Sequence, residues 1–367
     1  MVGRDPHEPH RVTTPLELFF DLTFVVAAGL AAERLHHYLS EDRIGHAVAG
    51  YLLVFFAIWW AWTNFSWFAS AYDTDDDLYR LTTLVQIAGA LVLAAGVPVA
   101  FDRGDLAAIT YGYVVMRVAV VVGWLRAARA DPERRGTALR FAAGVAVVQA
   151  GWVTRLELPE DWHLAATLAL IPADLLVPVW AQRRARTTSH PHHIAERYGQ
   201  FTIIVLGASV AAATVSVQDA INAGHFDAEL LGLAGAGLVI VFSMWWVYFD
   251  RPAHTLPTPS RRFPWAYGHY LVFAAAAAAG AGLGVAIDAK MHAARLSPLA
   301  AGYAIALPVT VFLLSVWALR VRRQVALPVA AGLVLATPFG PGPVYLTAAL
   351  TGALVAVMIL IGDRSAR

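Results

Sequence analysis

Twelve apolar stretches alternate with short polar linkers along the whole chain. Most of them run for about 20 residues, the length of a helix that crosses a hydrocarbon core of about 30 Å. The stretches lie at residues 15–37, 44–70, 78–100, 105–127, 137–153, 161–181, 195–217, 228–250, 265–288, 297–319, 324–338 and 343–361. This pattern predicts an all-α fold, a polytopic transmembrane helix bundle of about 12 spans. The eleventh stretch is short and ends among prolines, so a re-entrant segment, which would move the C-terminus to the other side, is the alternative there.

Composition supports a membrane protein rather than the two or three soluble domains that 367 residues would allow. Charged residues make up only 14% and apolar residues 58%, whereas soluble domains are about 25% charged. The mean hydropathy is +0.57. There is no cysteine, which excludes disulfides, thiol catalysis and cysteine-ligated metals. The first 14 residues are polar, so we expect the first helix itself to direct insertion.

The basic residues predict the orientation. With 12 spans, 20 of the 27 lysines and arginines fall on the side of the two termini, 6 fall on the opposite side, and Arg117 lies within a span. The positive-inside rule therefore places both termini in the cytoplasm. We expect a cytoplasmic segment 1–14, a six-helix half 15–181, a basic, histidine-rich cytoplasmic linker 182–194, a second half 195–361 and a cytoplasmic tail 362–367.

A short internal similarity relates spans six apart. The first span aligns with the seventh, and the tryptophan-rich end of the second span aligns with the end of the eighth. The aligned polar positions, which we take as candidates for a cytoplasmic mouth, are Glu17, Thr23, Asn64, Glu196, Gln200 and Asp250. An even offset predicts two parallel six-helix repeats. Chance similarity between interfacial aromatic belts is the alternative.

Ionisable side chains inside spans need a reason, because each costs about 2.5–3.5 kcal/mol near the bilayer centre. Glu17 has a local one. Thr14-Pro15-x-Glu17 is a capping box with proline at the first helical position, so Glu17 is predicted to cap the first helix. Asp21 lies one turn deeper on the same helical face and has no such explanation.

Two further charges lie at a similar depth. Arg117 is near the middle of the fourth span, and Asp174 is in the sixth span between two prolines. We therefore predict a buried charged cluster of Asp21, Arg117 and Asp174, extended by Thr23. A structural ion pair and a solute, ion or proton site are both open interpretations. The second half has nothing comparable, so charge chemistry is expected in the first half.

Other polar clusters favour surface roles. His192 and Glu196 share a helical face, but two ligands do not predict a metal site. The acidic turn at 73–77 lacks the glycine and closing glutamate of a calcium loop, so we expect it to pair with neighbouring arginines. Motifs for phosphate loops, nucleophile elbows and zincins are absent from the sequence. We predict no catalytic residue, no metal, no cofactor and no nucleic-acid partner.

Two stretches carry a family resemblance. Residues 11–25, RVTTPLELFFDLTFV, and residues 195–210, AERYGQFTIIVLGASV, resemble the two signatures of the low temperature requirement A (LtrA) family. The resemblance implies a multi-pass protein of the bacterial inner membrane, linked to growth in the cold and without an established activity. The family commonly has glutamate where this chain has Ala208, so an activity that used it would be lost or relocated here.

Three functions follow as hypotheses. The first is transport or conduction of a small solute or ion, with the charged cluster lining a path from the cytoplasm. The second is a non-transporting membrane protein for envelope or cold-stress adaptation, with structural charges. The third is an intramembrane enzyme using Glu17, or His192 with Glu196. The lipid bilayer is the expected partner in each case, and the sequence leaves the oligomeric state open.

Overall fold

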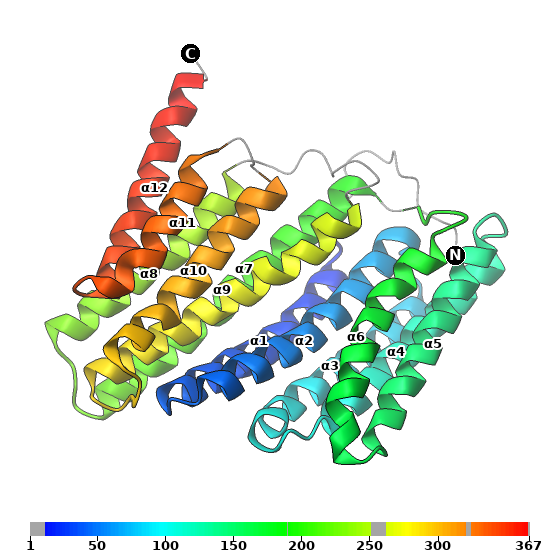
Figure 1. The fold of residues 1–367 in the computed structure, drawn as a ribbon. Coiled ribbons are helices and arrows are strands. Elements are labelled where there is room, and N and C mark those ends of the chain that lie inside the picture. Colours follow the sequence, from blue (N-terminus) through cyan, green and yellow to red (C-terminus); the bar gives the residue numbers. More distant parts are fainter. Residues whose placement is uncertain (1–11, 189, 251–261, 321–323, 366–367) are drawn as a thin grey trace. The chain divides into compact units, whose positions relative to one another are not determined.

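The computed structural model describes residues 12–188, 190–250, 262–320 and 324–365, and within these ranges the regular structure is helical (Figure 1). This confirms the all-α prediction. Eleven of the helices are long and apolar enough to cross a membrane. The elements are α1 Pro15–Ser40, α2 Ile44–Tyr72, α3 Asp77–Arg103, α4 Ala107–Ala130, α5 Arg135–Leu156, α6 Glu160–Ala181, α7 Pro191–Asn222, α8 Ala228–Phe249, α9 Arg262–Lys290, α10 Pro298–Arg320, α11 Ala326–Ala336, the 3-10 helix η1 Thr337–Phe339 and α12 Pro343–Ser365.

The chain divides into two compact units. Unit 1 contains Met1–Ala27 and Ala57–Arg197, and unit 2 contains Ala28–Phe56 and Tyr198–Arg367. These boundaries differ from the two halves expected from the sequence, because α1, α2 and α7 each contribute residues to both units. The internal repeat therefore remains a prediction.

The core of unit 1 is an aromatic cluster among helices that follow one another in the chain. Helices α3 to α6 pack in sequence order. The ring of Trp124 on α4 stacks on Phe141 of α5 with centroids 4.2 Å apart, and Phe68 of α2 meets the same indole edge-on at 5.1 Å. Large aromatic rings bury much area and prefer such offset or edge contacts. This packing holds α2, α4 and α5 in place around the charged residues described below.

In unit 2, small residues let helices approach closely. A Cβ atom added to Gly282 of α9 would lie 2.2 Å from the carbonyl oxygen of Ala304 on α10, and one added to Gly280 would lie 2.6 Å from the Cα of Ser209 on α7. Contacts of this kind are typical of helix pairs in membranes. They bring the glycine- and alanine-rich stretch of α9 into direct backbone contact with α7 and α10.

The short helix α11 returns the chain to the level where α8 and α10 begin. Thr310 of α10 donates to the carbonyl oxygen of Ala331 at 3.3 Å, so the two helices lie side by side. Further along, Pro338 and Pro343 pack against Gly302, in the second turn of α10. Tyr345, in the first turn of α12, donates to the carbonyl oxygen of Glu229 at the start of α8, at 3.2 Å.

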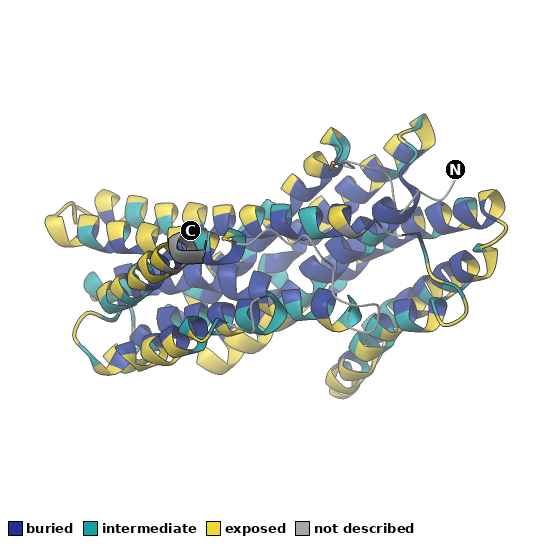
Figure 2. Cartoon of the chain, turned by 90° about the horizontal axis from the view of Figure 1, so that it is seen from above, coloured by how far each residue is buried: buried dark blue, intermediate teal, exposed yellow. Residues whose placement is uncertain are grey.

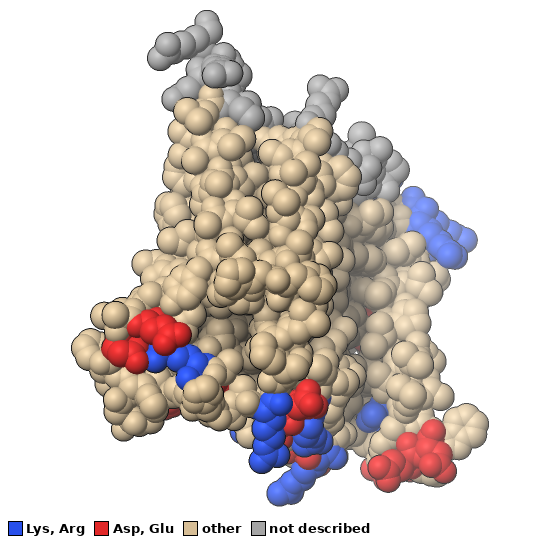
Figure 3. All heavy atoms as spheres, turned by 60° about the vertical axis from the view of Figure 1, so that its left-hand side comes forward, with Lys and Arg blue, Asp and Glu red and all other residues tan. Residues whose placement is uncertain are grey.

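The surface fits a lipid environment. Many helices have one buried and one exposed face (Figure 2), and the exposed faces carry large apolar side chains such as Leu84, Leu168 and Leu238. On the face shown in Figure 3, charged side chains gather in a few groups, and most of the surface that can be seen is uncharged. Exposed apolar area of this extent is unusual for soluble monomers, and the chain is a multi-pass helical membrane protein embedded in a lipid bilayer.

The acidic turn before α3 pairs with arginines, as predicted. Asp76 is the N-cap of α3, and its carboxylate accepts the backbone N–H of Tyr79 and two bonds from the guanidinium of Arg126 on α4. Asp75 pairs with Arg80 at 2.9 Å. The hydrogen bond from Arg126 is the main reason that the pKa of Asp76 lies well below its usual range.

Candidate functional site at the start of helices α1 and α7

Asp21 forms a fully buried ion pair with Arg197. The Nη2 atom of Arg197, in the second turn of α7, donates to Oδ1 of Asp21 at 2.7 Å, and both side chains are 0% exposed. The indole N–H of Trp62 on α2 donates to the same oxygen at 2.8 Å. Arg197 also donates to the hydroxyl of Ser66 at 3.0 Å, and its guanidinium lies 5.5 Å from the ring centroid of Phe65. Helix α2 thus supplies the surroundings of an ion pair between α1 and α7.

One helical turn nearer the helix starts, Glu17 meets His193. The imidazole Nε2 lies 3.2 Å from Oε2 of Glu17, and both side chains are 0% exposed. The same oxygen accepts the backbone N–H of Thr14 at 2.8 Å, while the hydroxyl of Thr14 accepts the N–H of Glu17 at 3.2 Å. These reciprocal bonds confirm the predicted capping box. Glu17 therefore caps α1 and also binds a buried histidine of α7.

The two contacts between α1 and α7 have the same sequence separation. Glu17 and His193 are 176 residues apart, as are Asp21 and Arg197, so each four-residue step along α1 matches a four-residue step along α7. Helices that pair in this way run parallel, and both begin at the site. Their opening turns are joined once more where the backbone N–H of Thr13 donates to Oε1 of Glu196 at 3.4 Å.

A second buried ion pair joins α4 and α6. Arg117 donates from Nη2 to Oδ1 of Asp174 at 2.9 Å and from Nη1 to Oδ1 of Asn64 at 3.2 Å. The indole N–H of Trp152 on α5 donates to the other oxygen of Asp174 at 2.8 Å. The Arg117 guanidinium lies 5.3 Å from the ring centroid of Tyr113. The structure thus joins two members of the predicted three-residue cluster, and the third, Asp21, takes Arg197 as its partner instead of Arg117.

The two ion pairs differ in how completely their polar atoms are bonded. Around Asp174, both carboxylate oxygens accept a hydrogen bond, and its partners leave no buried polar side-chain atom unbonded among the described residues. The site at α1 and α7 has several such atoms. They are Oε1 of Glu17, Oδ2 of Asp21, Nδ1 of His193, and Nε and Nη1 of Arg197. Buried polar atoms without partners cost free energy and are uncommon in native proteins, so each requires an explanation.

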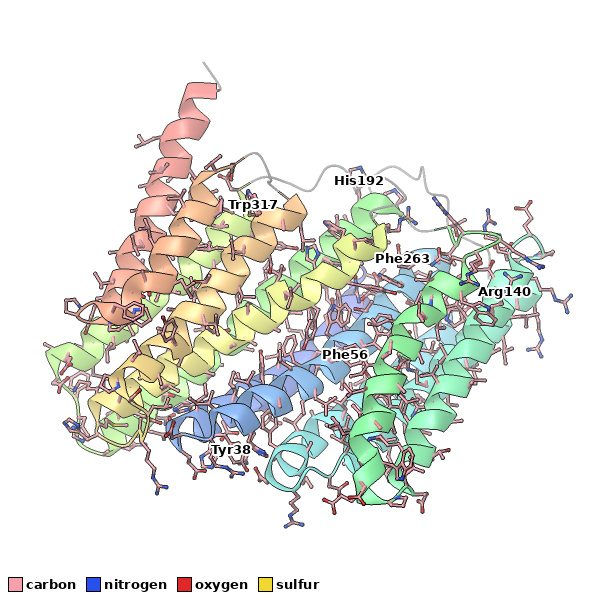
Figure 4. All side chains as sticks on the ribbon, in the orientation of Figure 1. Tyr38, Phe56, Arg140, His192, Phe263 and Trp317 are labelled. Carbon is pink, nitrogen blue, oxygen red and sulfur yellow. The ribbon has the colours of Figure 1, made fainter. Side chains whose placement is uncertain are left out.

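The other predicted residues lie around these sites or apart from them. The hydroxyl of Thr23 donates to the carbonyl oxygen of Phe20 at 2.7 Å within α1, rather than extending an ionic cluster. Asn64 belongs to the Arg117 site. Gln200 is half-buried in α7, and Asp250 is exposed at the end of α8. His192, labelled in Figure 4, is exposed at the first turn of α7, while the neighbouring His193 is the buried one.

Sequence reasoning missed both partners of the buried carboxylates. The count of basic residues includes Arg197 on the side predicted to be cytoplasmic. His193 lies in the segment 182–194, which is predicted to be a cytoplasmic linker. Charge chemistry is consequently not confined to the first half, because Arg197 lies beyond residue 195. The sequence contains one signal, because Pro191 suits the first position of a helix. Helix α7 does begin at Pro191 rather than at 195, so it includes His193 and Arg197, which lie four residues apart on one helical face.

Unit 2 contains an apolar cavity of about 250 Å³ between α7, α8 and α9. Its lining includes Val210, Leu233, Val241 and Leu283, and Thr214 is its polar member. Such a lining suits hydrocarbon and supplies no charge. The cavity does not provide ion-binding groups, so the candidate site remains the polar cluster of unit 1.

Comparison with known proteins decides the family. The family model described as "Bacterial low temperature requirement A protein (LtrA)" matches residues 12–362. The chain belongs to the LtrA family. A curated relative is an uncharacterized protein of Rhizobium meliloti (strain 1021), 29% identical over 280 residues. That similarity covers 69% of this chain and 64% of the relative, so the chain spans less than two thirds of the relative's length.

Both stretches that resemble the LtrA signatures contribute to the buried site. The first contains Glu17 and Asp21, and the second contains Glu196 and Arg197. Arg11, at the beginning of the first stretch, lies outside the described residues. Ala208, at the position where the family resemblance implies glutamate, is fully buried in unit 2. In this LtrA member the buried carboxylates of the site are those of α1.

Proposed function

We propose that this LtrA protein moves a small solute or ion across the bacterial inner membrane through the site formed by Glu17, Asp21, His193 and Arg197. One observation carries the proposal: four ionisable side chains are fully buried at the start of two helices, and each has a polar atom without a partner. Ionisable groups within membrane spans commonly mark solute or ion pathways.

The arrangement supports binding in preference to simple bracing. A structural ion pair gains most when all its hydrogen-bonding groups are satisfied, because desolvation otherwise outweighs the attraction. The site at α1 and α7 instead retains acceptors on both carboxylates and donors on Arg197. These groups are suited to exchange partners with a small polar species. We propose no catalytic role for them, since binding and release need no bond cleavage.

We also propose the orientation of the path. The predominance of arginines on the side of the termini places the starts of α1 and α7 in the cytoplasmic leaflet. The Glu17 and His193 pair would then lie nearer the cytoplasm, with the Asp21 and Arg197 pair one turn, about 5.4 Å, deeper.

A second candidate function is that of a non-transporting membrane protein that supports envelope or cold-stress adaptation. The ion pair of Arg117 and Asp174 favours it, because that pair has its hydrogen bonds satisfied and fits a bracing role. Both kinds of charge can occur in one protein, so the choice depends on whether the protein carries a flux.

The test is flux in proteoliposomes. Purified protein would be reconstituted into vesicles that contain a dye sensitive to pH, K⁺ or Na⁺, one dye in each preparation, and entry of each ion would be followed for the wild type, Asp21→Asn and Asp75→Asn. We expect a wild-type flux of at least one of these ions, reduced at least tenfold in Asp21→Asn. Asp75→Asn, the same change in an exposed turn, should retain the flux. Equal rates in wild type, Asp21→Asn and empty vesicles would reject transport of these ions.

A further inference from the structure

Among the described residues, the formal charges of the buried site do not balance. In their ionised forms, Glu17 and Asp21 bring two negative charges, and Arg197 brings one positive charge, all on side chains that are 0% exposed. A net charge removed from water carries a large solvation cost, which a nearby opposite charge must offset. The site therefore favours one additional positive charge. The group already in place to hold it is the imidazole of His193, since histidine exchanges a proton near neutral pH.

The hydrogen bonds specify which nitrogen takes the proton. Oε2 of Glu17 already accepts the N–H of Thr14, so an ionised Glu17 accepts from His193 as well, and Nε2 must carry hydrogen. The other nitrogen, Nδ1, is buried without a hydrogen-bond partner. Protonation at Nδ1 converts neutral His193 to imidazolium and leaves the bond to Glu17 intact. The site then contains two negative and two positive charges.

The surroundings favour this charge. The carboxyl groups of Glu17 and Asp21 face the site from α1, and the uncharged side chains that face it from α2 belong to Trp62 and Ser66. Glu196 is only half-buried, so its charge is better screened than those of the fully buried groups. Among the residues that the structure describes, the charged and titratable neighbours are Glu17 and Asp21 on α1, His190 just before α7, and Glu196 and Arg197 on α7, with Trp62 and Ser66 facing the site from α2.

We propose that His193 is a proton-binding site whose occupancy is set by the charge of Asp21. Asp21 acts through the electrostatics of the cluster, because its own bonds go to Arg197 and Trp62. If the proposed function holds, the transported or coupled species would be a proton, and in this respect alone the inference rests on the proposed function. Proton binding itself is measurable without any flux.

The experiment reads the protonation of His193 directly. Full-length protein labelled with ¹⁵N-histidine would be placed in lipid nanodiscs at pH 7, and nitrogen spectra would be recorded. The two ring nitrogens have similar shifts in imidazolium and widely separated shifts in neutral imidazole. The signal of His193 would be assigned as the one that disappears in His193→Gln.

We expect imidazolium at His193 in the wild type. In Asp21→Asn the ratio of imidazolium to neutral imidazole should fall at least about tenfold, the effect of removing one nearby buried charge. Glu17→Gln should give the same loss and should fold, since glutamine also completes a capping box. Glu33→Gln, an exposed change on α1, should leave the His193 signal as in the wild type.

Two results would overturn the inference. One is neutral His193 in the wild type at pH 7. The other is imidazolium that persists unchanged in Asp21→Asn and Glu17→Gln, since the charge of the carboxylates would then not control the proton. These failures are distinct from failure of the proposed function. A protein with protonated, Asp21-dependent His193 and no flux would refute transport alone, whereas Asp21-dependent flux with neutral His193 would refute the proton site alone.

Discussion

At the scale of single residues, the two buried ion pairs show that burial alone does not assign a role. Both carboxylate oxygens of Asp174 and both terminal nitrogens of Arg117 take part in hydrogen bonds, with Asn64 and Trp152 as the further partners. Asp21 and Arg197 are equally buried but keep atoms without partners. A pair whose polar atoms are all bonded gains no further hydrogen bond from a ligand, whereas a pair with unbonded polar atoms does. In the function proposed above, the degree of satisfaction, rather than depth in the span, distinguishes the bracing pair from the binding site.

Removal of one member of the satisfied pair should be strongly destabilising. Arg117→Leu leaves Asp174 buried without a counter-charge, and we expect the free energy of unfolding to fall by about 3–5 kcal/mol. The double variant Arg117→Leu, Asp174→Leu should recover much of this loss, because no buried charge remains. Unfolding in mild detergent, followed by tryptophan fluorescence, measures both. A double variant no more stable than the single one would contradict a role limited to charge compensation.

At the scale of the elements, the packing of α9 depends on residues without side chains. The nearest atoms to a Cβ at Gly282 belong to the backbone of Ala304 and Ile305, which cannot move aside as a flexible side chain could. Gly207 of α7 differs, since an added Cβ there meets nothing within 4 Å. The two glycines form a matched pair for testing helix contact.

Gly282→Ala should lower the free energy of unfolding by about 1–3 kcal/mol or more, the usual cost of overpacking. Gly207→Ala should be neutral or stabilising by up to about 1 kcal/mol, because alanine favours helix over glycine. Thermal unfolding of both variants in the same detergent compares them. Equal stability of the two would show that α9 and α10 separate easily at Gly282.

The link between α3 and α4 should depend on pH. Arg126 holds the pKa of Asp76 below its usual value in the folded protein. A group with a lowered native pKa stabilises the fold above its unfolded pKa, about 3.9, and this stabilisation is lost as the pH falls toward the native pKa. Asp76→Asn keeps an N-cap oxygen but removes the charge.

We therefore expect the wild type to exceed Asp76→Asn in stability at pH 7 by about 0.2–1 kcal/mol, the range for partly exposed pairs. The difference should shrink as the pH is lowered below about 4. Melting temperatures of both proteins from pH 7 to pH 3 provide the comparison. A difference that widens on acidification would contradict the pairing with Arg126.

At the scale of the whole molecule, the shortest apolar helix decides on which side the chain ends. Helix α11 with η1 covers only 14 residues, fewer than a full span needs. Its end nevertheless lies beside Gly302 of α10, and α12 begins beside Glu229 of α8. The linker before α12 therefore lies at the level where α8 and α10 start. This favours a full return crossing by α11 and η1, and the cytoplasmic location of both termini remains a prediction.

Cysteine labelling tests this topology without background, because the native chain has no cysteine. Pro341→Cys lies between η1 and α12, and we expect a membrane-impermeant maleimide to label it from outside the cell, as it should label Glu157→Cys. Arg184→Cys should be labelled only in inverted vesicles. Labelling of Pro341→Cys only from the cytoplasmic side would show that α11 is re-entrant.

The sequence by itself determined the helices and their local ends. Apolar runs long enough to span a membrane must be helical, because lipid cannot bond exposed backbone groups. The capping box of α1 was readable because Thr14 and Glu17 lie three residues apart. The acidic turn could likewise be expected to find arginines. The helices depend on composition and the capping box on neighbours three residues apart, whereas the Arg126 partner of Asp76 lies 50 residues away in the sequence.

Only the tertiary structure decided the partners of the buried carboxylates. His193 and Arg197 lie 176 residues from Glu17 and Asp21. In sequence, Arg197 has the features of any basic residue near the cytoplasmic end of a span. Whether such a side chain reaches water or turns inward depends on which helices meet at that end. The parallel, in-step contact of α1 and α7 turns it inward, and that contact brings Asp21, a single unexplained charge in the sequence, into a four-residue buried site.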